Sequence, residues 1–471
     1  MEAPVRHIAL NGAALAEARP LSSPVPVRGL SYRAALWISR LGRLAAIWLP
    51  VWAICVMAYP TSGRALAASL VFTLVWKLAL RRSYDDVAVT VWTIGAVVPA
   101  LVGAVVGALV ILPLSVRVPL LQLHGSTLAE LTFVVLCASA VWETAVAGSL
   151  AARRRILVVG AAGGGTDLLE DVSAAPRLPF EVVGVVDGDR ASDRVAGVPC
   201  FGSTDDLPEI VEELRPQLIV LANERCRAEA LERLIDVSHL DFRVVGLAEF
   251  YEYAFGRLPV RNLTPQWFMS VLHLYRRPYP RVAKRAFDLV VASAALAIVA
   301  PLLPVIALLV RLTPGPAIHR QTRLGEAGKP FTIYKFRTMG ANAEPRGPVW
   351  ASLRDPRVTR VGRLLRKTRL DELPQLWNVL RGDMSIVGPR PERPEIVTSL
   401  QRRTPFWSRR HLVKPGITGW AQVCRGYTAD AAGTRDKLSY DLWYLRHRSL
   451  VVDLAICART FWVLVTCSGA R

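Results

Sequence analysis

Charged residues are scarce in this chain of 471 residues. Asp, Glu, Lys and Arg together make up 20% of it, whereas apolar residues make up 52%. This composition is too apolar for an ordinary soluble enzyme, and the mean hydropathy of +0.31 agrees. We therefore expect membrane-spanning segments.

Cysteine pairs are also lacking. The seven cysteines lie singly, with no C-x-x-C motif, and Cys55, Cys137 and Cys457 lie inside apolar runs. This distribution excludes a disulfide framework and a structural zinc site, and it predicts reduced thiols.

Acidic residues are few, 38 against 58 Lys and Arg, which gives a formal charge of +20. Residues 281–471 contain 32 Lys/Arg and only 13 Asp/Glu, so nearly all of the net charge belongs to the C-terminal region. A nucleic acid, an anionic lipid or a phosphorylated metabolite would each suit such a surface, and charge alone does not choose among them.

Four apolar stretches follow a tail that does not resemble a cleavable signal sequence, residues 1–30, which we expect to be mobile and cytoplasmic. Each stretch is near the roughly 20 residues that a spanning helix requires. Arg43, Lys77, Glu130 and Glu143 lie within them, so an in-plane or bundle-buried placement stays open. The stretches cover about 43–60, 62–80, 87–112 and 128–150.

Basic residues predict the orientation of this block. They precede the first stretch and follow the second and fourth, whereas the other two loops hold only Arg64 and Arg117. By the positive-inside tendency, both ends of the block face the cytoplasm. The basic residues on that side are Arg28, Arg33, Arg40, Arg81, Arg82, Arg153, Arg154 and Arg155.

Buried strands alternate with helical segments over roughly 154–255, which predicts a small parallel α/β domain. The glycine-rich turn after its first strand invites a dinucleotide-binding interpretation, but Ala162 replaces the second glycine of G-x-G-x-x-G. Asp187 ends the second strand and is either a ribose ligand or a turn former. We favour a structural or regulatory domain.

An apolar run at 286–310 has basic residues on both flanks, and Pro301 and Pro304 lie near its middle. Each proline removes a helical hydrogen bond and bends the helix. A re-entrant helix that turns at the prolines and returns to the cytoplasmic face satisfies both observations. A kinked full span is the alternative.

The adjacent carboxylates Asp371 and Glu372 stand among seven cations in the sequence. We expect this surround to keep both carboxylates ionised and to attract a polyanionic substrate. Pro374 two residues later predicts a helix start, so Asp371 is either an ordinary N-cap or a nucleophile whose neighbour holds a divalent metal. A helix N-terminus would lower the carboxylate pKa further. The cations are Arg363, Arg366, Lys367, Arg369, Arg381, Arg390 and Arg393.

A series of motifs in residues 284–441 resembles the bacterial sugar transferase family, the polyprenyl-phosphate hexose-1-phosphate transferases that start polysaccharide repeat units. The long N-terminal half resembles that of the large initiating members. The motifs occur in order as KRAFD at 284–288, GP at 315–316, QTRLG at 321–325, YKFRTM at 334–339, DPRVTRVG at 355–362, LDELPQLWN at 370–378, GPRP at 388–391, KPGITGW at 414–420 and YD at 440–441.

The resemblance implies a two-step exchange at the cytoplasmic membrane face. Asp371 attacks the sugar-bearing phosphorus of a UDP-hexose and releases UMP, and undecaprenyl phosphate then takes the phosphosugar. Glu372 matches the partner carboxylate that holds Mg²⁺. Lys335, Arg337, Arg366 and Arg390 match substrate-binding cations, and Pro301 matches the break of the re-entrant helix.

The expected protein is thus a multi-pass protein of the bacterial inner membrane. Its partners are a UDP-hexose, undecaprenyl phosphate and an anionic lipid bilayer, with no nucleic acid and with surfaces for a homodimer. A membrane-bound oxidoreductase or epimerase and a non-catalytic membrane scaffold or nucleotide-binding regulator of polysaccharide assembly remain as alternatives. No residue identifies the sugar.

The expected fold is a four-helix transmembrane block, a Rossmann-like α/β cytoplasmic domain, and a re-entrant membrane helix with a mainly helical α+β catalytic domain. The boundaries are 1–30 for the tail, 31–152 for the transmembrane helices, 153–257 for the Rossmann-like domain, 258–280 for a linker and 281–471 for the catalytic domain with its re-entrant helix at 286–310.

Overall fold

The computed structural model divides the chain into two compact units, Met1–Phe255 and Gly256–Arg471. The predicted mobile tail, residues 1–30, and most of the predicted linker lie outside the described residues. The structure describes residues 32–85, 93–142, 154–263, 267, 280–340, 355–424 and 431–466, with short interruptions at 163, 176–177, 179 and 188–193.

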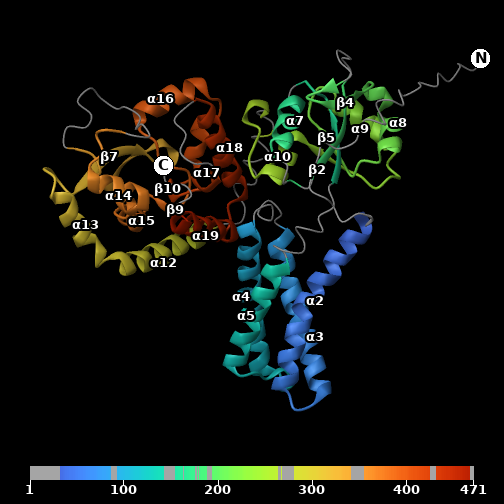
Figure 1. Cartoon of the computed structure of the whole chain (residues 1–471), viewed down its shortest axis with the longest axis horizontal. Helices are drawn as coiled ribbons and strands as arrows, with labels where there is room; N and C mark the ends of the chain where they lie inside the picture. Colours follow the sequence, from blue (N-terminus) through green and yellow to red (C-terminus); the bar gives the residue numbers. More distant parts are fainter. Residues whose placement is uncertain are drawn as a thin grey trace, which may run out of the picture. The chain divides into compact units, whose positions relative to one another are not determined.

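Four helices form a bundle in the first unit (Figure 1). Its core contains Phe72, Trp76 and Leu131, yet its outer surface is also apolar, with Leu74 and Leu109 more than half exposed. Among the described residues, one of the four helices is long and apolar enough to cross a membrane, over Leu41–Ala58. The helices are α2 (Tyr32–Ala58), α3 (Ser62–Asp85), α4 (Thr93–Arg117) and α5 (Gly125–Val141).

Lys77 and Glu130 lie on the exposed surface of this bundle. The bundle-buried alternative for these two residues is therefore wrong, because the inward positions of α3 and α5 are taken by apolar side chains such as Trp76 and Leu131. Glu143 lies outside the described residues.

A six-stranded sheet in the order β3-β4-β2-β1-β5-β6 follows, parallel except for the β3–β4 pair. Side chains of a strand alternate between the two faces of a sheet. In β1, Ile156 and Val158 pack with α7 and α10, whereas Leu157 and Val159 pack with α8 and α9. The predicted parallel α/β domain is confirmed.

The elements of this domain are β1 (Arg154–Val159), α7 (Gly165–Ser173), β2 (Phe180–Val186), β3 (Arg194–Val195), β4 (Val198–Phe201), η4 (Thr204–Asp206), α8 (Leu207–Leu214), β5 (Leu218–Leu221), α9 (Arg227–Ile235), β6 (Arg243–Gly246) and α10 (Leu247–Phe255).

The second unit contains a broken helix pair, α12 (Arg281–Val299) and α13 (Leu302–Arg311), bent by 64°. Pro301 is the N-cap residue of α13 and lies at the bend. Pro304 is the third residue of α13, in the first turn, where a proline costs no helical hydrogen bond. We therefore assign the break to Pro301 and correct the prediction for Pro304.

Helices and two small sheets form the rest of this unit (Figure 1). Strands β7 and β8 make an antiparallel hairpin, and β9 pairs in parallel with β10. The elements are η5 (Val260–Asn262), β7 (Ile318–Leu324), η6 (Glu326–Gly328), β8 (Pro330–Phe336), α14 (Arg360–Thr368), η7 (Leu370–Glu372), α15 (Gln375–Arg381), β9 (Ser385–Val387), α16 (Pro394–Arg403), η8 (Trp407–Leu412), β10 (Gly416–Thr418), α17 (Trp420–Cys424), α18 (Ala431–His447) and α19 (Leu450–Thr466).

Helix α12 is hydrogen-bonded to α15 and to β9, the two elements that follow the Asp371–Glu372 pair. The Arg285 guanidinium donates hydrogen bonds of 2.6 Å to the last carbonyls of α15, those of Val379 and Leu380. Asp288 Oδ1 accepts hydrogen bonds from Ser385 Oγ at 2.9 Å and from the Ile386 N–H at 3.0 Å, in β9. The KRAFD motif thus joins the broken helix to α15 and β9.

Candidate active site

The two carboxylates lie in the short 3-10 turn η7, between α14 and α15. Arg369 ends α14 in the left-handed conformation (φ 60°), which turns the chain and starts η7. The residue that caps α15 is Pro374, and it makes no side-chain cap bond. The alternative that Asp371 is an ordinary N-cap is therefore wrong. Both carboxylates are buried, Asp371 at 9% and Glu372 at 8% exposure.

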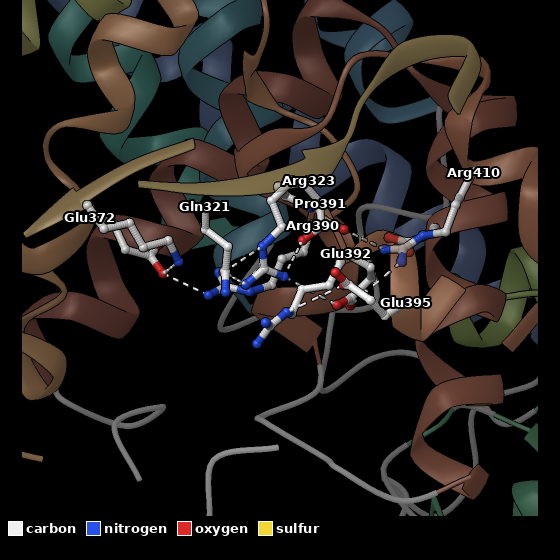
Figure 2. A network of polar contacts seen from close by, with 11 residues as sticks. Gln321, Arg323, Glu372, Arg390, Pro391, Glu392, Glu395 and Arg410 are labelled. Carbon is white, nitrogen blue, oxygen red and sulfur yellow. Dashed lines mark hydrogen bonds and ion pairs between the residues drawn. The ribbon is translucent and has the colours of Figure 1, made fainter. Parts of the chain in front are cut away.

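Glu372 is held by three cations at one oxygen, Oε1. Arg390 Nη2 donates a hydrogen bond of 2.8 Å to it, and Lys335 Nζ and Arg369 Nη1 lie 3.6 and 4.0 Å away. Figure 2 shows this carboxylate at one end of a polar network that runs through Arg390. Burial alone would raise the pKa of Glu372, but Arg390 and Lys335 outweigh it and hold the pKa well below its usual range.

Asp371 differs from Glu372 both in its contacts and in the direction of its pKa shift. Its buried Oδ1 has no hydrogen-bond partner among the described residues. Burial, and then the charge of Glu372, raise the pKa of Asp371 to about 6, although Lys335, Arg390 and Arg366 oppose the shift. The prediction that the surround lowers both carboxylate pKa values is therefore correct for Glu372 and wrong for Asp371, because desolvation of Asp371 exceeds the effect of the cations.

Three of the four predicted substrate-binding cations act on Asp371 from three different parts of the fold. Lys335 comes from β8, Arg366 from α14, and Arg390 from the segment after β9. Burial lowers the pKa of the Lys335 ammonium to about 8. Arg366 is oriented by a hydrogen bond of 2.9 Å from its Nε to Thr338 Oγ1.

Arg337, the fourth, lies apart from this set. Its buried guanidinium donates to backbone carbonyls at the end of α13, including Thr313 O at 2.8 Å and Val310 O at 3.1 Å, and also to Pro314 O. An arginine at this position satisfies carbonyls that a helix C-terminus leaves without partners. This placement argues against the predicted substrate contact for Arg337 and indicates a structural role.

The segment that carries Arg390 is positioned by close backbone contacts. A Cβ on Gly388 would lie 2.4 Å from the Lys414 carbonyl oxygen, and one on Gly416 would lie 2.1 Å from the Gly388 nitrogen. The Gly388 N–H donates to Thr418 O, and the Gly416 N–H donates to Pro389 O. Only glycine permits this approach, which explains the glycines in the GPRP and KPGITGW motifs.

Two residues that the sequence analysis did not single out lie on α15, directly after the pair. Gln375 is buried, and its Nε2 has no hydrogen-bond partner among the described residues. Asn378 is fully buried and joins α15 to β8, with Nδ2 donating to Thr332 O at 2.7 Å and Oδ1 accepting from the Tyr334 N–H at 3.1 Å. Their presence in the LDELPQLWN motif was the signal that could have identified them as site residues.

The donor atoms at this site fit Mg²⁺. Within the described ranges, no three or more His, Cys, Asp or Glu side chains are grouped to hold a metal. Mg²⁺, however, is commonly held by only one or two carboxylates together with substrate phosphates. All contacts of the Glu372 carboxylate with the described residues use Oε1, so Oε2 is available beside the unpartnered Oδ1 of Asp371.

The glycine-rich turn in the α/β domain has a different arrangement from a dinucleotide site. Gly160 adopts φ +88° directly after β1, as a tight turn requires. The Asp187 carboxylate, however, accepts a hydrogen bond of 3.1 Å from the Ala161 N–H of this turn. A carboxylate there occupies an amide that would otherwise face a pyrophosphate, which argues against the dinucleotide-binding interpretation.

Comparison with known proteins identifies two matching family models. The model described as bacterial sugar transferase matches residues 279–467, which covers the broken helix and the whole candidate site. The model described as CoA-binding domain matches residues 103–239, from α4 to the segment after α9.

Several curated relatives are also similar. The chain is 40% identical over 265 residues to the UDP-N-acetylgalactosamine-undecaprenyl-phosphate N-acetylgalactosaminephosphotransferase of Aeromonas hydrophila, covering 56% of this chain and 60% of the relative. It is 36% identical over 316 residues to the UDP-glucose:undecaprenyl-phosphate glucose-1-phosphate transferase of Escherichia coli (strain K12), covering 64% of this chain and 66% of the relative. A protein of the latter name from Caulobacter vibrioides is 46% identical over 200 residues, which are 41% of this chain and 75% of the relative.

Proposed function

Because the chain belongs to the bacterial sugar transferase family, we propose that it transfers a hexose-1-phosphate group from a UDP-sugar to undecaprenyl phosphate and releases UMP. We place this reaction at the first membrane step of exopolysaccharide, capsule or O-antigen repeat-unit synthesis. The names of the relatives differ in the sugar, N-acetylgalactosamine in one and glucose in another. The proposal therefore extends to UDP-hexoses and UDP-N-acetylhexosamines as a class.

In the first step, a carboxylate oxygen of Asp371 forms a bond to the sugar-bearing phosphorus. The bond from that phosphorus to the bridging oxygen breaks, and its electron pair leaves with UMP. The unpartnered Oδ1 supports this role, because its lone pairs are not engaged by any described donor. With a pKa of about 6, Asp371 is mainly ionised at neutral pH and is a stronger nucleophile than an unshifted aspartate.

Lys335, Arg366 and Arg390 bind the phosphate oxygens and offset the negative charge that two phosphates bring beside two carboxylates. Glu372 Oε2 would hold Mg²⁺, which would neutralise charge on the phosphate oxygens. Arg390 keeps Glu372 ionised and fixes its orientation through Oε1.

In the second step, an oxygen of undecaprenyl phosphate forms a bond to the same phosphorus. The bond between Asp371 and phosphorus breaks, and the carboxylate is restored. The acceptor lipid must be met at a membrane surface. The α12–α13 pair suits this task as a re-entrant helix, because it is bent by 64° and exposes apolar side chains such as Val290, Ile298 and Leu308.

Helices α2–α5 form the transmembrane block in this proposal. Support comes from their surface, since a bundle in water would present polar side chains outward, whereas Leu74, Leu109 and Phe133 are exposed here. The arginines that flank these helices favour a cytoplasmic position for both ends of the block, and we propose the same side for the active site.

The single observation that carries the proposal is the contrast within the pair: a pinned, ionised Glu372 beside an Asp371 oxygen without a partner. The test uses purified protein in lipid with Mg²⁺ and undecaprenyl phosphate. UMP release is measured over a panel of UDP-sugars, with Asp371→Asn as the paired variant.

We expect UMP from at least one sugar and its loss by several orders of magnitude in Asp371→Asn, since an amide is a poor nucleophile. Normal turnover in the variant would falsify the covalent mechanism. Absence of UMP with every donor would favour the membrane scaffold.

A further inference from the structure

Arg410 is a buried guanidinium behind the segment that carries Arg390. It lies on η8 with its side chain only 2% exposed, and its Nη2 is 2.7 Å from Oδ2 of the equally buried Asp441 on α18. Its Cζ lies 4.5 Å from the centroid of the Trp407 ring. These contacts leave the Arg410 side chain little freedom to move.

The same Nη2 donates a hydrogen bond of 3.0 Å to the Arg390 carbonyl oxygen. Arg410 Nη1 lies 3.7 Å from Glu392 Oε1. From a second direction, Arg323 Nη1 donates to the Pro391 carbonyl at 3.2 Å. Figure 2 shows the resulting network, which extends from Glu372 at one end to Arg410 at the other.

The sequence of this segment explains why it needs such support. Pro389 and Pro391 flank Arg390, and proline has no N–H to donate. The segment is therefore fixed mainly through its carbonyl oxygens, which accept from Arg410 and Arg323. Arg390 Nη2 in turn donates a hydrogen bond of 2.8 Å to Glu372 Oε1.

Stability does not account for the Arg410–Asp441 pair. Arg410 Nε and Nη1 are buried and donate no hydrogen bond to the described residues, which is costly for a charged group. A buried ion pair can often be replaced by apolar side chains with no loss of stability. Its retention next to the Arg390 carbonyl needs another reason.

Resting on the proposed function, we propose that Arg410, held by Asp441, is a positioning residue that places the Arg390 guanidinium on Glu372 and the donor phosphates. It acts on the reaction only through Arg390 and touches no reacting atom.

The test is a double-mutant analysis in the full chain in lipid, measured as release of radiolabelled UMP. Arg410→Met with Asp441→Leu removes both charges and leaves no unpaired ion in the core. We expect kcat to fall about 10- to 100-fold, the range for residues that orient a catalytic ligand, while the thermal unfolding midpoint stays near that of the wild type.

The decisive comparison repeats the double substitution in Arg390→Ala, and in Arg390→Lys should the alanine variant be inactive. If Arg410 acts through Arg390, the further loss in this background is under about twofold, because the linked residues are not independent. Arg285→Met is the matched control. It removes two hydrogen bonds at the end of α15, and its effect should multiply with that of Arg390→Ala.

Equal losses from the Arg410 and Asp441 double substitution in both backgrounds, or full activity of the double variant, would overturn the inference and leave the proposed function intact. A wild-type protein that releases no UMP would instead overturn the proposed function.

Discussion

Two neighbouring carboxylates, Asp371 and Glu372, acquire different properties because their oxygens meet different groups. Glu372 Oε1 faces three cations, whereas Asp371 Oδ1 is buried without a described partner. The sequence predicts the pair and its basic surround. It does not predict the opposite pKa shifts, because burial depends on how η7 packs in three dimensions.

The position of the Arg337 side chain could not be predicted from the sequence either. It is two residues from Lys335 in the YKFRTM motif, so sequence spacing alone favours a shared site. Strand β8, however, ends at Phe336, and the Arg337 side chain turns to the carbonyls at the end of α13. Which neighbour in a basic motif faces the substrate depends on where the strand stops.

The raised pKa of Asp371 predicts the pH dependence of the first step. The nucleophile must be ionised, so kcat/KM for UMP release should fall as pH decreases through about 6 and be flat just above it. An aspartate with an unshifted pKa would instead lose activity only as pH decreases through about 4. The measurement is a pH profile of initial rates in buffers of constant ionic strength.

A second variant tests whether Asp371 causes the acidic limb of this profile, the fall in rate at low pH. Arg390 lowers the pKa of Asp371, so its removal in Arg390→Ala should move the acidic limb to higher pH. A limb that stays in place, or moves to lower pH, would contradict the assignment of the limb to Asp371.

Among the elements, the broken helix is the feature that sequence reasoning describes best. Two prolines between basic flanks predict a bend, and the structure has one at Pro301. Strand β7 of the β7–β8 hairpin has no clear signal in the sequence, since Ile318–Leu324 is mostly polar and lacks alternation. Strands β9 and β10 have three residues each, too short for any periodic signal.

Replacement of Pro301 should straighten the helix pair. Pro301→Leu restores an N–H and relieves the clash with the preceding turn, an effect of about 3 kcal/mol in a helix interior. A continuous helix would place labels at positions 282 and 312 about 45 Å apart at 1.5 Å per residue, and the bent pair holds them closer. Pulsed electron resonance distances in lipid measure this, and we expect lengthening together with loss of UMP release.

Pro304→Leu is the matched control. Pro304 lies in the first turn of α13 and does not make the bend, so the distance should stay as in the wild type. Equal lengthening in both variants, or in neither, would refute the assignment of the break to Pro301.

At the scale of the whole molecule, the two units have separate hydrophobic cores. The whole bacterial sugar transferase match lies in the second unit, and every residue of the candidate site belongs to that unit. Alternating strand and helix patterns predict the α/β domain, because each pattern is local in sequence. The active site could be predicted only as a set of residues, since Lys335, Arg366 and Arg390 are brought together by contacts between distant segments.

In the proposed mechanism, the chain itself carries the phosphosugar between two substrates. Intact mass spectrometry tests this directly, on protein incubated with the active UDP-sugar and Mg²⁺ but without undecaprenyl phosphate. We expect an added mass equal to the hexose phosphate, located on the peptide that contains Asp371, discharged when undecaprenyl phosphate is added, and absent from Asp371→Asn. UMP release that needs undecaprenyl phosphate and leaves the protein mass unchanged would contradict the account and indicate direct transfer between the substrates.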